Sequence, residues 1–240
     1  MAPLRVDKAL PFLVPPLHAR ILGAMYWSGA VFMLASVSAK KWDEIRVITP
    51  MVAIWTGMLG IVSLLHLGLF SWALSQTWIW FGAYLVFPAM AAWITWRQRF
   101  QDTEAEGPAI PAALRAYLYT QGTLVTLLAG LLLLAPSFMT RVWPWQIVPE
   151  LAQIYSAPFL AYGLGSLLAA RQRSWAEARI AVYGTLVFGV LVLIASFVHS
   201  SLFDFGQPAT WVWFGGFILA TGALAIATLA LPPRPPEPAG

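Results

Sequence analysis

Two histidines in matching sequence contexts are the residues of this 240-residue chain best suited to chemistry. His66 follows Ser63 by three residues, and His199 follows Ser196 by three residues, so each pair lies on one face of a helix. An imidazole can accept or donate a hydrogen bond, ligate haem iron, or titrate near neutral pH. We consider four roles: a lock within each hairpin, contact with a ligand near an outer mouth, bis-histidine haem ligation and pH sensing.

The sequence after each histidine favours the first role. A Thr-Trp-x-Trp-Phe-Gly turn begins at Thr77 and again at Thr210, at equal spacing from the two histidines. A local lock requires this turn beside its histidine, whereas a shared central site does not. We therefore expect each imidazole to bond within its own hairpin, around 70–80 or 203–213. If the histidines instead contact a ligand, the candidate binding residues are Ser63, His66, Trp78, Trp80, Ser196, His199, Trp211 and Trp213.

Charged residues also recur at matching positions. Glu44 aligns with Glu177 at the offset that aligns the histidines, and the arginines two residues later align as well. A topological interpretation places each arginine at a cytoplasmic boundary and each glutamate near a helix N-terminus, where the helix dipole favours it. A more specific hypothesis is pairing between the two halves of the chain. The expected ion pairs are Glu44 with Arg179 and Glu177 with Arg46.

Tryptophans gather near the opposite boundary of the apolar runs. Amphipathic indoles prefer the headgroup level of a membrane, so an aromatic belt is the expected interpretation. The alternative is a ring of indoles that binds a ligand by stacking. The residues concerned are Trp72, Trp78, Trp80, Trp143, Trp145, Trp211 and Trp213.

Several kinds of chemistry have no counterpart in the sequence. The chain contains no cysteine, which excludes disulfides, thiolate metal sites and cysteine nucleophiles. No charged residue lies deep in an apolar run, so a proton- or sodium-coupled pump is not expected. Phosphate-loop, HExxH and nucleophile–base motifs are missing as well. We expect no enzymatic activity, no metal and no cofactor, with haem between the two histidines as the alternative.

The composition indicates the elements that must position these residues. About 60% of the chain is apolar and 10% is charged, whereas soluble domains carry about 25% charge. These values exclude a soluble enzyme, a disordered protein and a nucleic-acid binder. Because a membrane helix needs about 20 apolar residues, the sequence predicts an all-α integral membrane protein with seven transmembrane helices. The expected apolar runs are 21–39, 47–96 (divided at 71–77), 117–140, 151–170, 180–203 and 211–231.

An internal repeat organises these spans. The offset that aligns His66 with His199 also aligns 42–95 with 175–228, and the matches include rare Trp, His and Phe residues. The expected plan is 3+1+3 with parallel repeats, which places sites at the repeat interface. This plan is similar in topology to the small sugar carriers called SWEETs, although no motif of that family occurs here. A retinal pigment is not expected, because 211–231 contains no lysine. The expected segments are an N-terminal tail (1–18), a three-helix repeat (19–96), a cytoplasmic linker (97–116), a connecting helix (117–140), an outer loop with a second three-helix repeat (141–231) and a proline-rich tail (232–240).

The distribution of basic residues predicts the orientation of the chain in the membrane. Most of the 14 lysines and arginines flank the same side, which predicts an outside N-terminus and a cytoplasmic C-terminus in a bacterial inner or plasma membrane. The expected function is that of a non-enzymatic facilitative carrier or binding protein for a neutral or apolar small molecule at the repeat interface. The alternatives are an accessory subunit of a larger respiratory or photosynthetic membrane complex and a bis-histidine haem subunit. The expected partners are the lipid bilayer, a small ligand and membrane proteins, with no nucleic acid.

Overall fold

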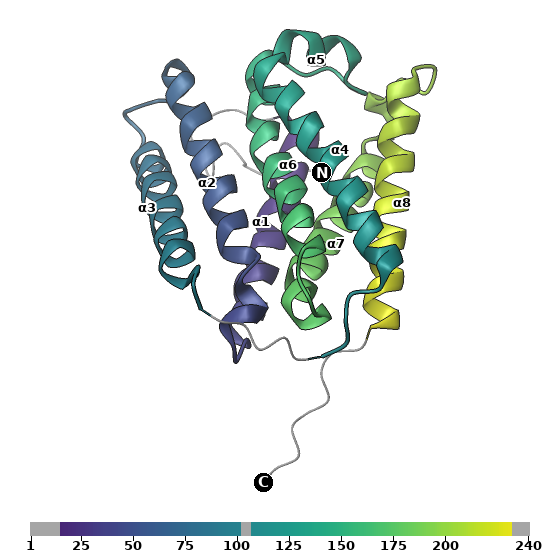
Figure 1. Ribbon diagram of the computed structural model, residues 1–240. Coiled ribbons are helices and arrows are strands. Elements are labelled where there is room, and N and C mark those ends of the chain that lie inside the picture. The colour runs from purple at the N-terminus through teal and green to yellow at the C-terminus, as the bar shows by residue number, and fades with distance from the viewer. Residues whose placement is uncertain (1–14, 102–106, 232–240) are drawn as a thin grey trace.

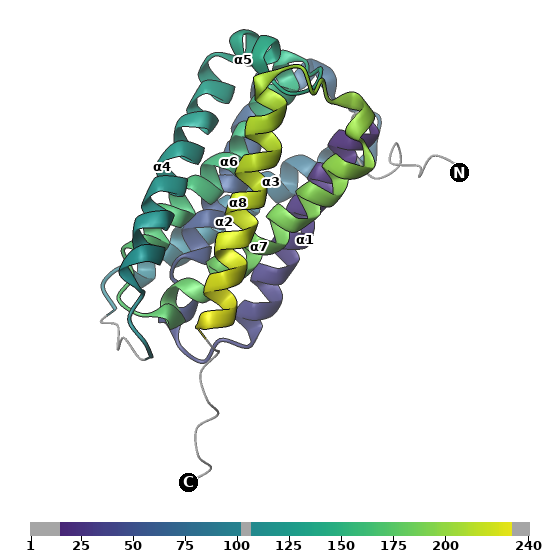
Figure 2. The same ribbon diagram turned by 90° about the vertical axis from the view of Figure 1, so that its right-hand side faces the viewer.

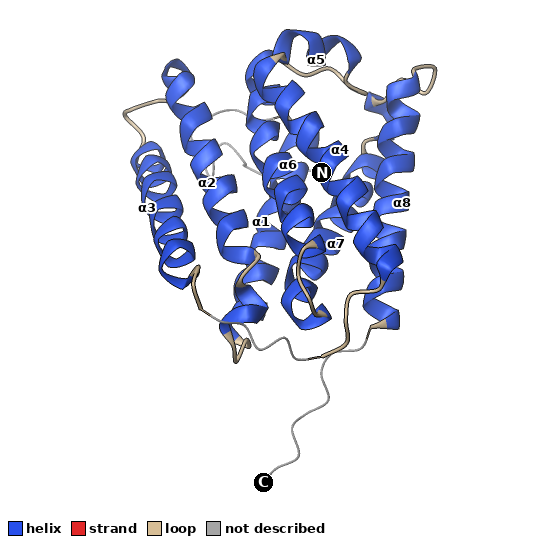
Figure 3. Cartoon of the chain, viewed as in Figure 1, coloured by secondary structure: helices blue, strands red, loops and turns tan. Residues whose placement is uncertain are grey.

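The computed structural model describes residues 15–101 and 107–231, and these residues form helices joined by short connections (Figures 1 and 3). Seven of the helices are long and apolar enough to cross a membrane, as the composition predicts. The expected tail at 232–240 and most of the one at 1–18 lie outside the described residues. The helices are α1 (Pro16–Val37), α2 (Ile48–Leu65), α3 (Ser75–Gln98), α4 (Ala112–Leu134), α5 (Pro136–Val142), α6 (Pro149–Ala170), α7 (Trp175–Val198) and α8 (Pro208–Ala230), with short 3-10 turns η2 (Trp42–Ile45), η3 (Leu67–Leu69) and η4 (Ser200–Leu202).

Prolines set several helix boundaries. Pro16, Pro149 and Pro208 each stand in the first turn of a spanning helix, where the missing N–H is not needed and the fixed φ suits the helix. Pro136 likewise begins the short helix α5, so the apolar run expected at 117–140 is divided between α4 and α5. Helix α1 begins at Pro16 rather than at 21, and this earlier start brings His18 into the membrane-spanning bundle.

The packing of the spanning helices joins segments far apart in the sequence. Helices α2 and α3 form one hairpin, and α7 and α8 form another, with both turns at the same end of the bundle (Figure 1). Helix α1 packs against α7, and α6 packs against α2 (Figures 1 and 2). Helix α4 lies along α6. We call the end with η3 and η4 the hairpin end, and the end with η2 the linker end.

Small residues allow the close approach of these helices. The Phe32 ring of α1 lies directly over Gly184 of α7, where a Cβ atom would come 2.0 Å from ring atom Cε1. In the other contact, Met51 of α2 lies over Gly165 of α6, where a Cβ would come 2.4 Å from the sulfur. The constant offset of the sequence aligns Phe32 with Gly165 and Gly184 with Met51. The two contacts therefore occupy equivalent positions with the large and small residues exchanged.

Candidate functional site

All eight candidate ligand-binding residues lie at or beside the two hairpin turns, and the backbones of these turns match closely. Each histidine ends its helix, a 3-10 turn follows, and the next residue is extended, with φ −99° and ψ 134° at Phe70 and φ −97° and ψ 134° at Phe203. Thr77 Oγ1 donates to the Ser71 carbonyl at 2.6 Å. Thr210 Oγ1 donates to the Asp204 carbonyl at 2.7 Å. These threonine bonds close each turn against the start of the following helix.

A serine–tryptophan bond locks each hairpin. Trp80 Nε1 donates to Ser63 Oγ at 2.9 Å, and the bond joins α3 to α2. Trp213 Nε1 donates to Ser196 Oγ at 2.9 Å, and the bond joins α8 to α7. All four side chains are buried. The hydroxyls proposed as ligand contacts are thus engaged within the protein, and the local lock expected of the histidines is formed by Ser and Trp instead.

The two other candidate tryptophans face outward. Trp78 is 63% exposed and Trp211 is 62% exposed. Trp78 Nε1 donates to the Trp72 carbonyl at 3.2 Å, and Trp211 Nε1 donates to the Phe205 carbonyl at 2.9 Å. Exposed indoles at the end of spanning helices have the placement of an aromatic belt. Trp78 and Trp211 are thus held apart from the buried serine–tryptophan pairs.

Each histidine bonds to a helix of the opposite half, so the expectation of a partner within its own hairpin is wrong. His66 Nε2 donates to Gln153 Oε1 of α6 at 2.6 Å, and Gln153 Nε2 donates to the Leu133 carbonyl at 3.0 Å. His199 Nε2 accepts a hydrogen bond from the Arg20 guanidinium of α1. The reason is tertiary: the histidines stand at helix ends that pack beside α6 and α1. Burial, and then the charge of Arg20, lower the pKa of His199.

These two contacts are equivalent in sequence. The offset that aligns His66 with His199 also aligns Arg20 with Gln153. Each contact therefore joins the second helix of one half to the first helix of the other. We call the two contacts together the histidine latch. His66 and His199 do not share a partner in this arrangement, and each offers one ring nitrogen to its own neighbour.

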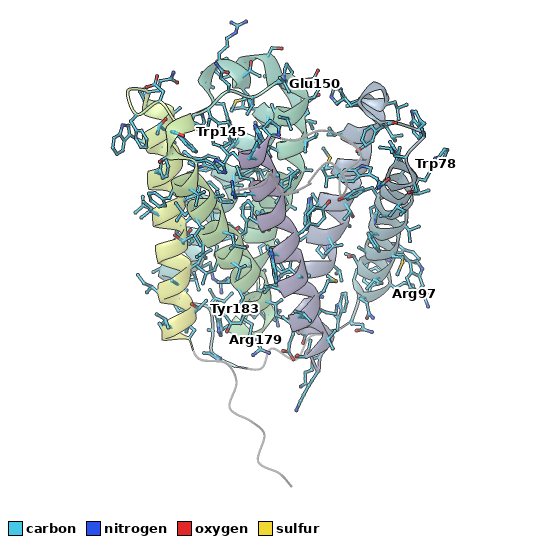
Figure 4. The ribbon with its side chains drawn as sticks, turned by 180° about the vertical axis from the view of Figure 1, so that it is seen from behind. Trp78, Arg97, Trp145, Glu150, Arg179 and Tyr183 are labelled. Atoms are coloured by element: carbon cyan, nitrogen blue, oxygen red, sulfur yellow. The ribbon has the colours of Figure 1, made fainter. Side chains whose placement is uncertain are left out.

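At the linker end the structure contains one of the two expected ion pairs. Arg179 of α7 pairs with Glu44 of η2, and the Glu44 carboxylate also accepts the Lys40 backbone N–H at 3.3 Å. Arg179 lies at the end of the bundle opposite Trp78 and Trp145 (Figure 4). The carboxylate is buried, so this pair joins the two halves in a poorly solvated place.

The prediction of a second ion pair, between Glu177 and Arg46, is wrong. Glu177 Oε1 instead accepts from the backbone N–H and the hydroxyl of Ser174, at 3.1 and 2.8 Å, which completes a capping box at the start of α7. Arg46 donates to the Gln101 carbonyl at 3.5 Å. The sequence explains the difference, because Lys41 occupies the position that aligns with Ser174 and provides no side-chain cap. Because no side-chain cap forms at Lys41, the Glu44 carboxylate is not held in a capping box and can pair with Arg179.

A buried aromatic cluster, which the sequence patterns did not predict, lies at the hairpin end. His18 bonds through Nδ1 to the Tyr155 hydroxyl, and the two rings stack with centroids 5.6 Å apart. Trp145 packs edge-on against Trp213 at 4.8 Å, and Trp143 does so at 5.5 Å. Trp143 and Trp145 are buried, as are Trp80 and Trp213, so an aromatic belt is the wrong interpretation of these four. Pro16 in a helix-starting position was the signal that could have placed His18 in a spanning helix.

The chain matches no known family model, and it shows no significant similarity to a curated protein or a solved structure. Within residues 15–101 and 107–231, no group of three or more His, Asp or Glu side chains could hold a metal ion. A cavity of about 10 Å³ lies among α4, α6, α7 and α8, with Ser166 and Thr185 in its wall.

Proposed function

We propose that this chain is a facilitative carrier or binding protein for a neutral or apolar small molecule. It is built from two parallel three-helix repeats, the first in 19–96 and the second, with an outer loop before it, in 141–231, and α4 joins them. The matched hairpins and the reciprocal packing of α1 on α7 and α6 on α2 support the duplication. In the proposed orientation the hairpin end faces outside and the linker end faces the cytoplasm, following the distribution of basic residues.

One observation carries the proposal: polar side-chain contacts join the two repeats at both ends of the bundle. The histidine latch lies at the hairpin end, and the Glu44–Arg179 pair lies at the linker end. Alternating access requires that one end open while the other stays closed, and parallel repeats can rock against each other for this purpose. Each end is joined by a few polar contacts, which would break in turn as the repeats rock.

The chemistry of the contacts argues for an uncharged substrate. The ion pair and the Arg20–His199 contact stand at the ends of the spans, and the residues between them at the repeat contacts are mainly apolar or hydroxylic. A charged substrate would need fixed counter-charges deeper in the bundle. Each histidine also gives Nε2 to Gln153 or Arg20, so bis-histidine haem ligation is left out of the proposal. An accessory subunit stays the alternative, which stoichiometric co-purification of other membrane proteins would support.

The natural absence of cysteine makes a cross-linking test direct. One double variant, His66→Cys with Gln153→Cys, bridges the hairpin end, and a second, Glu44→Cys with Arg179→Cys, bridges the linker end. The control pair, Ser71→Cys with Thr77→Cys, lies within one hairpin. Proteoliposomes are assayed for uptake of glycerol, glucose and menadione before and after oxidation, and again after reduction.

We expect either bridge between the repeats to stop uptake reversibly, while the control bridge leaves uptake unchanged. A second readout needs no substrate: alkylation of Ser166→Cys by a small maleimide should accelerate when Glu44→Gln breaks the linker-end pair. The carrier proposal is refuted by two results together: uptake of every solute at the rate measured for protein-free liposomes, and an alkylation rate at position 166 that is the same with and without Glu44→Gln.

A further inference from the structure

Three side chains with polar hydrogens meet on the lipid-facing side of the first three helices. Tyr26 of α1 and Tyr84 of α3 share a hydrogen bond, with their hydroxyl oxygens 2.7 Å apart. The Trp55 ring of α2 lies beside Tyr26, with ring centroids 5.9 Å apart. We call these three residues the phenol site. Tyr26 is 44% exposed, and the other two are half-buried, so the site is open to the surroundings of the bundle.

The phenol site lies near the middle of the membrane. Tyr26 stands halfway along Pro16–Val37, and Tyr84 stands close to the middle of Ser75–Gln98. At 1.5 Å per residue, Tyr26 is about 15 Å from either end of its helix, and Tyr84 is about 14 Å from the N-terminal end and about 21 Å from the C-terminal end of its own. At this depth of a hydrocarbon layer about 30 Å thick, neither water nor a phospholipid headgroup is within reach of a hydroxyl.

The phenol site has more hydrogen-bond donors than it uses. Two phenols and one indole provide three polar hydrogens, and the bond between Tyr26 and Tyr84 uses one. Trp55 Nε1 has no partner among the described residues, but this atom is buried inside the protein, so a ligand arriving from lipid does not reach it. One phenolic hydrogen remains for a ligand, because the shared bond is the one hydrogen bond that the described structure gives to either phenol. An unsatisfied donor in hydrocarbon is costly, so an acceptor from another molecule would stabilise it.

The second repeat provides an internal comparison. At the constant offset, Tyr26, Trp55 and Tyr84 align with three phenylalanines. Phe159 and Phe188 are buried in the core, and Phe217 is packed against it. Phenylalanine rings therefore pack well at these three positions of the fold. Tyrosine and tryptophan occur in their place in the first repeat, where the rings face lipid. Partition into lipid would favour phenylalanine at the lipid-facing positions, so neither packing nor lipid contact accounts for the two hydroxyls. The aligned residues are Phe159, Phe188 and Phe217.

We propose that Tyr26 and Tyr84, beside the Trp55 ring, bind a small apolar ring compound through its carbonyl oxygen. The occupant must be apolar because it arrives from the hydrocarbon layer, and it must bring an acceptor because the phenols have a hydrogen to spare. A carbonyl on a flat ring meets both needs and stacks on the exposed aromatic faces. Phospholipid ester carbonyls lie too near the headgroups to reach this depth. The site is distinct from the repeat contacts of the proposed carrier.

Gly29 contributes to the shape of this site. A Cβ atom on Gly29 of α1 would lie 3.1 Å from Trp55 Cζ3, so glycine lets the indole lie close against the α1 backbone. This position of the indole places Trp55 beside Tyr26. Tyr84 is held in turn by the Trp80 ring, at a centroid distance of 4.5 Å. The donors are thus fixed by packing before any ligand binds.

The test compares two probes that differ in their carbonyls, menadione and 2-methylnaphthalene. Binding of each radiolabelled probe to the protein in nanodiscs is measured by equilibrium dialysis, with empty nanodiscs as the reference for partition into lipid. The variants are Tyr26→Phe, Trp55→Phe, Tyr84→Phe and the triple variant, which install the residues of the second repeat. Tyr119→Phe, which alters an exposed phenol on α4, is the matched control.

We expect menadione to bind above the lipid reference and 2-methylnaphthalene to bind about fivefold more weakly, the worth of one net hydrogen bond. The triple variant should bind both probes alike. Each single variant should retain most menadione binding, because a phenol with a hydrogen to donate remains and the Trp55 N–H does not reach the ligand. Tyr119→Phe should match the unaltered protein. Menadione binding no better than 2-methylnaphthalene, or unaffected by the triple variant, would overturn the assignment. This outcome is independent of the cross-linking result, since the two experiments alter different residues.

Discussion

The contact between α1 and α7 allows a quantitative prediction for Gly184→Ala. The new methyl carbon would lie 2.0 Å from Phe32 Cε1 and 2.5 Å from Cδ1, whereas carbon atoms need more than 3.4 Å. The Phe32 ring is 2% exposed, so its neighbours leave it little room to turn aside. Ser28 Oγ holds the same backbone by donating to the Gly184 carbonyl at 2.7 Å. The two helices must therefore move apart.

The magnitude follows from three terms. Overpacking of a buried site costs about 1–3 kcal/mol. Weakening the Ser28 hydrogen bond costs about 1 kcal/mol. Replacement of glycine by alanine within a helix returns about 1 kcal/mol. We expect Gly184→Ala to lower the free energy of unfolding by about 1–3 kcal/mol, and Phe32→Leu in the same chain to recover part of this loss.

Two matched variants separate overpacking from a general effect of alanine. Gly165→Ala meets the flexible Met51 side chain, which can adopt another rotamer, so its cost should be smaller than that of Gly184→Ala. Gly222→Ala meets nothing within 4 Å and should be neutral or stabilising. Unfolding is followed by tryptophan fluorescence during SDS titration in mixed micelles. If Gly184→Ala is as stable as Gly222→Ala, the packing of Phe32 described above is refuted.

Three further predictions concern other parts of the chain. An impermeant maleimide should label Gly206→Cys from outside intact cells and Arg173→Cys only after permeabilisation, and the reverse pattern would invert the proposed orientation. Because the pKa of His199 is lowered in the folded protein, its contribution to the free energy of unfolding should be fully present above about pH 6.5 and decrease as the pH drops below that value. In unfolding titrations at about pH 7.5 and about pH 5, His199→Gln should reduce the difference in stability between the two pH values. Gly163→Ala should destabilise more than Gly165→Ala in the same SDS assay, since its Cβ would lie 2.7 Å from the Thr126 backbone nitrogen, which no rotamer change can move, and equal costs would contradict this.

The seven spans could be predicted from the sequence because the relevant physics is local. A helix in lipid satisfies its own backbone hydrogen bonds, so a sufficiently long apolar run is enough to define it. Helix ends were less accurate where proline was involved, as at Pro16 and Pro136. The capping box at Ser174 and Glu177 was also legible in the sequence as a Ser-x-x-Glu pattern, and reading it would have removed the false pairing with Arg46.

The partners of the candidate residues were decided by tertiary structure. Spacing places His66 and His199 at equivalent helix ends, but it does not say which helix lies beside each. That choice depends on how whole helices pack, here α6 beside α2 and α1 beside α7. The same holds for the phenol site, whose residues become neighbours only when three helices assemble. Sequence alone thus determined which residues recur and where they stand along each helix, and the packing of large side chains against glycines decided which of them meet.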